Sequence, residues 1–180
     1  MRVDKENTLT LVVDIQEKLF PHMQNKEELL ENCTKLIKGL QLLEIPFILN
    51  EQYPKGIGAT LPELKELLPT LSAYEKVTFS CCKNDATLQA IKEADKKYVI
   101  VFGIEAHVCV LQSVLDLLAL GYTPVLVTDC ISSRKESDKN VAITRMIQAG
   151  AIPSTYESLL FELCVSAKNN AFKQMSQIIK

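Results

Sequence analysis

The chain has 180 residues, 47% of them hydrophobic and 23% charged, which is typical of one folded domain and unlike disordered or collagen-like sequences. Its 20 Lys and Arg residues against 22 Asp and Glu give a net charge of −2, a balance that does not favour binding to a nucleic-acid backbone or an anionic membrane surface. The longest apolar runs have the length of a strand, far short of the ~20 residues needed to cross a bilayer. We therefore expect a single domain over residues 1–180 that binds neither nucleic acid nor membrane.

The first seven residues do not have the pattern expected of a targeting segment. Residues 1–7 contain Asp4 and Glu6 and lead directly into an apolar strand pattern, unlike a secretory signal or an acidic-poor transit peptide. The six cysteines lack the paired spacings of a zinc site. We expect a cytoplasmic protein whose cysteines are mostly buried thiols, with an organellar location left open.

Apolar, β-branched runs of strand length alternate with segments of helical periodicity. In chain order, the expected strands are Thr8–Ile15, Pro46–Asn50, Ala73–Ser80, Lys97–Ile104, Thr123–Asp129 and Ala151–Tyr156. The expected helices are Lys26–Leu43, Leu61–Leu68, Asp85–Ala94, His107–Leu120, Ser137–Ala149 and one or two within Glu157–Lys180. This alternation predicts a three-layer α/β/α fold with a six-stranded, mostly parallel, Rossmann-like sheet. The long irregular stretch Glu51–Thr60 is a candidate lid.

Polar residues at strand ends are candidates for function, because ligands bind beyond the carboxyl ends of the strands in such sheets. Asp14 and Asp129 each close an apolar run, and a turn or N-cap carboxylate is the structural alternative for both. Lys76 interrupts a short strand pattern, where the alternative is an edge strand that presents a charge to solvent.

Cys109 follows a buried strand and a glycine turn, near the start of an amphipathic helix. The free N–H groups and dipole of a helix start stabilise a thiolate, so we expect a lowered pKa and a nucleophilic role. The alternative is a small buried helix residue, which describes most cysteines.

Three motifs give the chain a resemblance to a known family. They are Leu11-Val12-Val13-Asp14-Ile15-Gln16, Lys76-Val77-Thr78-Phe79-Ser80 and Gly103-Ile104-Glu105-Ala106-His107-Val108-Cys109-Val110. In this order and at these separations, the chain resembles the isochorismatase-like cysteine hydrolase family over nearly its whole length. Its later motifs look closest to the isochorismatase domain-containing subgroup, whose substrate is uncertain.

The resemblance implies a catalytic triad. Cys109 would be the nucleophile that forms a thioester-type acyl-enzyme, Asp14 the general acid and base, and Lys76 the electrostatic stabiliser. The family also carries a cis peptide bond, here between Ile104 and Glu105, which would turn the backbone N–H groups of Glu105 and Cys109 into an oxyanion hole.

Two departures from the family narrow the expected chemistry. Nicotinamidase-like members bind a metal through Asp-x-His after the second strand, but this chain has Asn50-Glu51-Gln52-Tyr53 there. We therefore expect no catalytic metal and no cofactor. Isochorismatases proper lack the cysteine, so Cys109 favours attack on an amide-, imide- or nitrile-like carbon.

The substrate pocket is expected to include Phe20, Gln52, Tyr53 and His107, which lie after strand ends or in the first loop. His107 has the alternative of a helix-start residue or an exposed one. We expect a small-molecule substrate and, from the resemblance, a homo-oligomer.

Two other functions compete with the cysteine hydrolase. The first is a non-catalytic interaction protein that keeps the scaffold. The second is a ribonuclease, a name carried by some proteins that resemble this subgroup. A ribonuclease needs a phosphate-binding surface and usually acid–base histidines, whereas this chain has two histidines and a slightly acidic balance.

Overall fold

A six-stranded parallel sheet in the order β3-β2-β1-β4-β5-β6 forms the centre of the computed structural model, which describes residues 2–180. The strands are β1 (Thr8–Val13), β2 (Phe47–Gln52), β3 (Ala73–Lys76), β4 (Tyr98–Ile104), β5 (Thr123–Ser132) and β6 (Ile152–Ser154). Every residue of β1 and β4 is buried, as expected for central strands covered on both faces.

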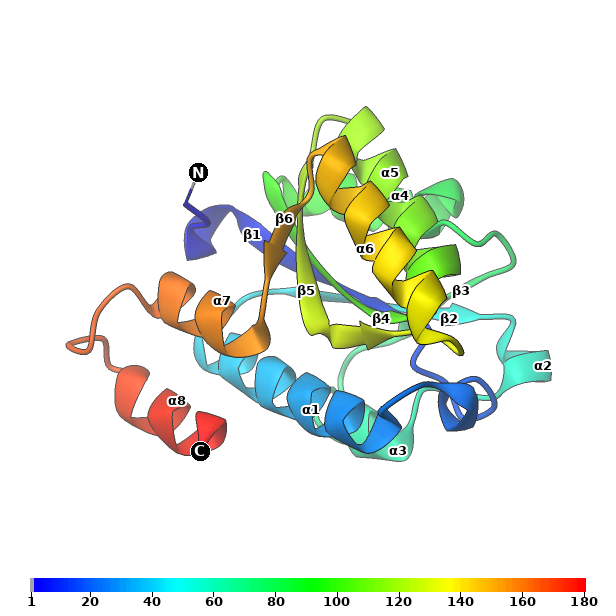
Figure 1. Cartoon of the computed structure of the whole chain (residues 1–180). Coiled ribbons are helices and arrows are strands. Elements are labelled where there is room, and N and C mark those ends of the chain that lie inside the picture. The colour runs from blue at the N-terminus through cyan, green and yellow to red at the C-terminus, as the bar shows by residue number, and fades with distance from the viewer. Residues whose placement is uncertain (1) are drawn as a thin grey trace.

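Helices cover both faces of the sheet (Figure 1), with α1, α7 and α8 on one side and α4, α5 and α6 on the other. The helices are α1 (Lys26–Leu42), α2 (Pro54–Ile57), α3 (Pro62–Lys65), α4 (Asp85–Ala94), α5 (Leu111–Ala119), α6 (Glu136–Ala149), α7 (Tyr156–Cys164) and α8 (Phe172–Ile179). The predicted three-layer α/β/α class is therefore confirmed. Within residues 2–180, no helix is both long enough and apolar enough to span a membrane.

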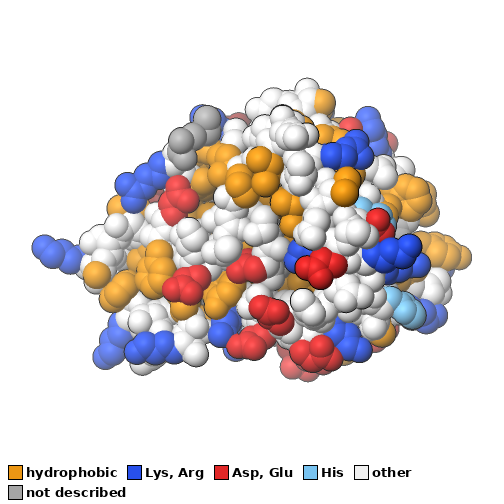
Figure 2. Space-filling model, viewed as in Figure 1, with side chains coloured by type: hydrophobic (Ala, Val, Ile, Leu, Met, Phe, Trp, Pro, Cys, Tyr) orange, Lys and Arg blue, Asp and Glu red, His pale blue; other side chains and the backbone are white. Residues whose placement is uncertain are grey.

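Acidic and basic side chains share the face seen in Figure 2, with several acidic ones gathered along α1. This mixture agrees with the nearly balanced composition of 20 basic and 22 acidic residues.

Some predicted boundaries were wrong for identifiable reasons. β1 ends at Val13 because Asp14 takes the left-handed conformation (φ 52°), which stops an extended strand. β3 ends at Lys76. The following residues turn back toward the Lys76 side chain, and its ammonium donates to the carbonyls of Thr78 and Phe79. The expected helix at His107 begins with a π-helical turn, Ala106–Val110, before α5.

The sheet order places β1 beside β4, where the connections turn to opposite sides. In open α/β sheets, such a switch point leaves a crevice outside the carboxyl ends of the two strands. Asp14 follows β1 and Glu105 follows β4. The fold therefore directs both chain segments to one crevice.

Gly103 allows β4 to lie close against β1 at this crevice. It pairs with Val13, has φ +128°, and a Cβ there would lie 2.0 Å from the Val13 carbonyl oxygen. We expect Gly103→Ala to lower the unfolding free energy by at least about 3 kcal/mol, because backbone has to move in addition to the strained φ. Urea unfolding of the purified variant measures this.

Gly121→Ala is the matched control for that experiment. Gly121 also has positive φ (+87°), but a Cβ there would meet nothing within 4 Å. The cost should be about 1 kcal/mol, from backbone conformation alone. Equal losses in the two variants would contradict the close approach at Gly103.

Candidate active site

Asp14 and Lys76 form a buried ion pair at the carboxyl edge of the sheet. Their side chains are both 0% exposed, and Nζ of Lys76 lies 2.7 Å from Oδ2 of Asp14. The same ammonium also donates to Oε1 of Gln52 at 2.7 Å and to the carbonyls of Thr78 and Phe79. The solvent-edge alternative for Lys76 is therefore wrong, because its charge faces inward and is fully surrounded by acceptors.

Burial and the mutual attraction of the two charges act in opposite directions on the pKa values of Asp14 and Lys76. Burial raises the pKa of Asp14 above its ordinary 3.8, and the attraction of Lys76 lowers it only in part. For Lys76, burial works against the charge, but the attraction of Asp14 and of nearby thiols leaves the pKa raised above 10.5. Lys76 is thus held as an ammonium, and Asp14 has a higher proton affinity than an ordinary carboxylate.

Cys109 lies in the π-helical turn after β4 and is 5% exposed. Burial raises the pKa of its thiol, the negative charge of Asp14 raises it further, and Lys76 lowers it. The helix start was expected from the sequence to lower the pKa of Cys109, and this expectation was wrong. Loss of water around the sulfur outweighs the effect of the helix dipole. Burial therefore favours the neutral thiol over the thiolate, so attack by this sulfur calls for a base.

Asp14 has an oxygen available for that purpose. Its Oδ2 is taken by Lys76, whereas Oδ1 is buried and has no hydrogen-bond partner among residues 2–180. A buried carboxylate oxygen without a donor costs free energy, and a catalytic role explains why such an atom is retained. Since the charge of Asp14 acts on the pKa of Cys109, this oxygen is suited to accept the thiol proton.

Cys109 opens onto a cavity of about 310 Å³. Its lining combines apolar walls with a few polar groups: Leu19, Gln52, Ile57, Phe79, Glu105, Val108, Cys109 and Arg134. Such a mixture is typical of sites for small molecules.

Of the four expected pocket residues, Gln52 lines this cavity, and its side chain also accepts from Lys76. Phe20 is not part of the lining described for residues 2–180, where Leu19 stands instead. Tyr53 is 53% exposed, with its ring against Gly56. His107 faces Ser133, with Nδ1 2.9 Å from the hydroxyl oxygen, and lines a separate hollow beside α6.

The stretch expected to be a lid is an anchored wall. The amide of Gln16 donates to the carbonyls of Gln52 and Gly58 at 3.0 and 2.6 Å. The buried carboxylate of Glu51 accepts from both the N–H and the hydroxyl of Thr60, each at 2.7 Å. These contacts hold α2, so that Ile57 forms part of the cavity wall.

The cavity lining also contains Glu105, which the sequence analysis expected at the site, and Arg134, which it did not assign there. The Ile104–Glu105 peptide bond is cis. Glu105 is buried, and its Oε1 accepts from Nε of Arg134 at 2.6 Å. Arg134 comes shortly after β5, the neighbour of β4, and a basic residue just beyond a buried strand is the signal that could have indicated it.

Asp129 does not join the site. β5 continues to Ser132, so Asp129 lies within the strand, and its Oδ1 accepts from the N–H of Tyr156 at 2.9 Å. Asp129 is therefore neither a turn residue nor an N-cap, since the N-cap of α7 is Thr155. Its carboxylate binds the first N–H of α7 from the neighbouring strand.

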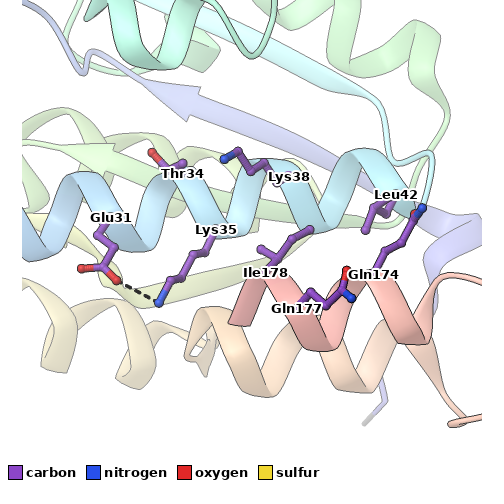
Figure 3. Close-up of a pocket in the computed structure, with 8 residues that line it drawn as sticks. All are labelled: Glu31, Thr34, Lys35, Lys38, Leu42, Gln174, Gln177 and Ile178. Carbon is purple, nitrogen blue, oxygen red and sulfur yellow. Dashed lines mark ion pairs between the residues drawn. The ribbon is translucent and has the colours of Figure 1, made fainter. Parts of the chain in front are cut away.

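A larger hollow of about 700 Å³ lies between α1 and α8, away from Cys109. Figure 3 shows its lining, in which Glu31 and Lys35 form an ion pair at 2.9 Å on α1.

Within residues 2–180, no cluster of three or more His, Cys, Asp or Glu side chains is placed to hold a metal ion.

Comparison with known proteins gives concordant results. The Isochorismatase domain model matches residues 8–158. Isochorismatase family protein 1A of Dictyostelium discoideum is 37% identical over 173 residues, covering 93% of this chain and 84% of that protein. Isochorismatase domain-containing protein 2A of Mus musculus is 35% identical, with 99% and 85% covered.

Solved structures share the fold over nearly the full length. The MAR1 ribonuclease of Caenorhabditis elegans has a TM-score of 0.94 and 38% identity, with 99% of this chain and 92% of that one covered. The YcaC gene product of Escherichia coli, described as an octameric hydrolase of unknown specificity, has a TM-score of 0.95 and 26% identity, with 99% and 89% covered.

Proposed function

The chain belongs to the isochorismatase family, and from this premise we propose that it is a metal-independent cysteine hydrolase of small C–N substrates. The single observation that carries the proposal is the buried Asp14–Lys76 pair beside a cysteine that lines a cavity. A fully buried ion pair contributes little to stability compared with apolar packing. The presence of this pair beside a thiol that lines a cavity is therefore better explained by chemistry.

The proposed reaction begins with proton transfer. Oδ1 of Asp14 accepts the thiol proton while Sγ of Cys109 attacks the carbon of an amide-like substrate. The substrate oxygen takes the negative charge, and the N–H groups of Glu105 and Cys109 donate to it. As this intermediate collapses, the C–N bond breaks, Asp14 gives its proton to the leaving nitrogen, and a thioester remains.

Water completes the cycle. Asp14 takes a proton from the attacking water, the C–S bond breaks, and the proton returns to the sulfur as the acid product leaves. Lys76 stays charged throughout and holds the Asp14 carboxylate in position.

Related proteins support covalent chemistry and self-association. The YcaC structure from Pseudomonas aeruginosa, 27% identical to this chain, contains covalent acrylamide, and the Escherichia coli protein is described as an octamer. We extend both properties to this chain as part of the proposal, with a homo-oligomer as the working form.

Ribonuclease activity is the second candidate, because a relative of 38% identity carries that name. Acid–base cleavage of RNA usually uses histidines. Here His107 is turned toward Ser133 and Glu105, and His22 lies in a separate turn after β1. The described cavity thus favours the cysteine reaction.

A substrate panel separates these functions. Small amides, imides and nitriles are incubated with the protein and assayed for ammonia release, with a labelled RNA oligonucleotide as a parallel arm. We expect ammonia from at least one C–N compound and a mass increase on Cys109. RNA cleavage without turnover of any panel compound would favour the ribonuclease, and inactivity in both arms would favour a non-catalytic scaffold.

The pH profile of kcat/KM follows from the ion pair. Activity should fall in acid with a midpoint above 3.8, because burial raises the pKa of Asp14 and only its ionised form can accept the thiol proton. Loss of the Lys76 ammonium should produce no alkaline limb below pH 10.5, because its pKa is raised above that value. Steady-state kinetics across pH test this, with circular dichroism at each pH to exclude unfolding. A midpoint at or below 3.8 would contradict it.

A further inference from the structure

A guanidinium group with two uncommitted nitrogen atoms faces the same cavity as the Cys109 thiol. Arg134 lines the cavity, and its side chain is 62% exposed. Among residues 2–180, the only hydrogen-bond partner of the guanidinium is Glu105, and that contact uses Nε at 2.6 Å. The two terminal Nη atoms are therefore open to a further group.

Glu105 holds the guanidinium in place. Its side chain is 8% exposed, with Oε1 accepting from Arg134 and Oε2 lying 3.5 Å from Nε2 of His107. The backbone carbonyl of Arg134 also accepts from the amide of Gln24 at 2.9 Å. A guanidinium fixed through Nε presents its outer pair of N–H groups as a fork, which matches the two oxygens of a carboxylate.

No other cation of the described chain serves the cavity in this way. Lys76 is 0% exposed, and its ammonium is already surrounded by four acceptors. The rest of the wall is mainly apolar, from Leu19, Ile57, Phe79 and Val108. The lining of the cavity therefore has a nucleophile, apolar walls and one cation, Arg134, whose Nε is paired with the carboxylate of Glu105.

We propose that Arg134 determines specificity by binding a carboxylate of the substrate. The preferred substrates would then be small amide-like compounds that carry a free carboxylate some distance from the scissile C–N bond. This inference rests on the proposed hydrolase function for its chemistry. The volume of about 310 Å³ and the apolar walls favour such a molecule over an RNA strand, although a phosphodiester offers the same fork a pair of oxygens.

The test uses protection of Cys109 from iodoacetamide, a neutral thiol reagent, followed by peptide mass spectrometry. Butyrate and butyramide serve as probes, because they match in chain length and differ in charge. Butyrate should protect Cys109 at a concentration at least tenfold lower than butyramide. Arg134→Gln should abolish this preference. Arg145→Gln, which removes an equal charge from an exposed position on α6 outside the cavity, should retain it.

Three results would overturn the proposal: equal protection by both probes, a preference that survives Arg134→Gln, or stronger protection by dimethyl phosphate than by butyrate, which would indicate a phosphodiester site. Failure of the hydrolase function looks different, since the substrate panel would then release no ammonia, and Cys109 need not react with iodoacetamide. In that case saturation-transfer NMR measures the binding of butyrate and of butyramide without the thiol reaction, and the difference between them gives the preference for the anion. A preference that depends on Arg134 supports the site there, and its absence overturns it.

Discussion

Replacing Cys109 with serine should lower the rate of amide hydrolysis by at least about a thousandfold, because the nucleophile acts as a unit with its base. A serine hydroxyl is much less acidic than a thiol, so the Asp14 carboxylate is too weak a base to activate it. The two side chains are similar in size, and the variant should fold normally. Ammonia release at saturating substrate measures the loss, and intact-protein mass spectrometry should show that the acyl adduct is absent.

Cys164→Ser is the matched control for this substitution. Cys164 is also buried, at 1% exposure, but it ends α7 and is not part of the cavity. Its replacement should leave kcat within about twofold of the original, because substitutions away from the site act mainly on stability. Similar losses in the two variants would show that Cys109→Ser acts through folding.

Replacing Lys76 with methionine should lower the unfolding free energy by about 3–5 kcal/mol, because it leaves Asp14 as a buried carboxyl without its partner. The variant should also lose activity, since the base is no longer held beside the thiol. Without Lys76, the main influence that lowers the pKa of Asp14 is gone, so this pKa rises further in the folded protein.

That rise gives the Lys76→Met variant a characteristic pH dependence. Between the ordinary value of 3.8 and the raised value, the carboxyl is protonated when folded and ionised when unfolded. The folded state then binds more protons, so the unfolding free energy falls as pH rises through this range. Urea unfolding from pH 4 upward measures it.

The double variant Asp14→Asn, Lys76→Met tests the cause of that instability. It removes the buried carboxyl together with its partner, so it should be more stable than Lys76→Met and lose the pH dependence attributed to Asp14. Equal stability of the single and double variants at all pH values would show that the buried charge is not the cause.

The three-layer fold could be predicted because the apolar strand runs and the helical periodicities of the sequence both agree with it. The β-branched runs of β1 and β4 and the amphipathic periods of the helices between strands are local patterns that burial on two faces requires. The residues at which the strands end were harder to predict from the sequence. They depend on Asp14 adopting φ 52° and on Lys76 turning inward, which are tertiary effects with no periodic signal.

The candidate site was predictable only in part. Family motifs indicated Asp14, Lys76 and Cys109, but the 62-residue separation of the ion-paired residues is bridged by sheet register, which residue types alone do not reveal. Part of the cavity wall comes from loops whose paths depend on anchors such as Gln16. Leu19 and Ile57 therefore line the cavity, and the expected Phe20 and Tyr53 are not part of its lining. The direction of the Cys109 pKa shift was missed because burial outweighs the position in the helix.

The most direct measurement is the rate at which each cysteine reacts with iodoacetamide in the folded protein. All six cysteines are free and buried, but Cys109 opens onto the cavity and lies beside a base. We predict that it reacts at least tenfold faster than any other, and that Asp14→Asn removes most of this difference. A Cys109 that reacts no faster than the other cysteines would contradict the claim that these three residues form a catalytic unit.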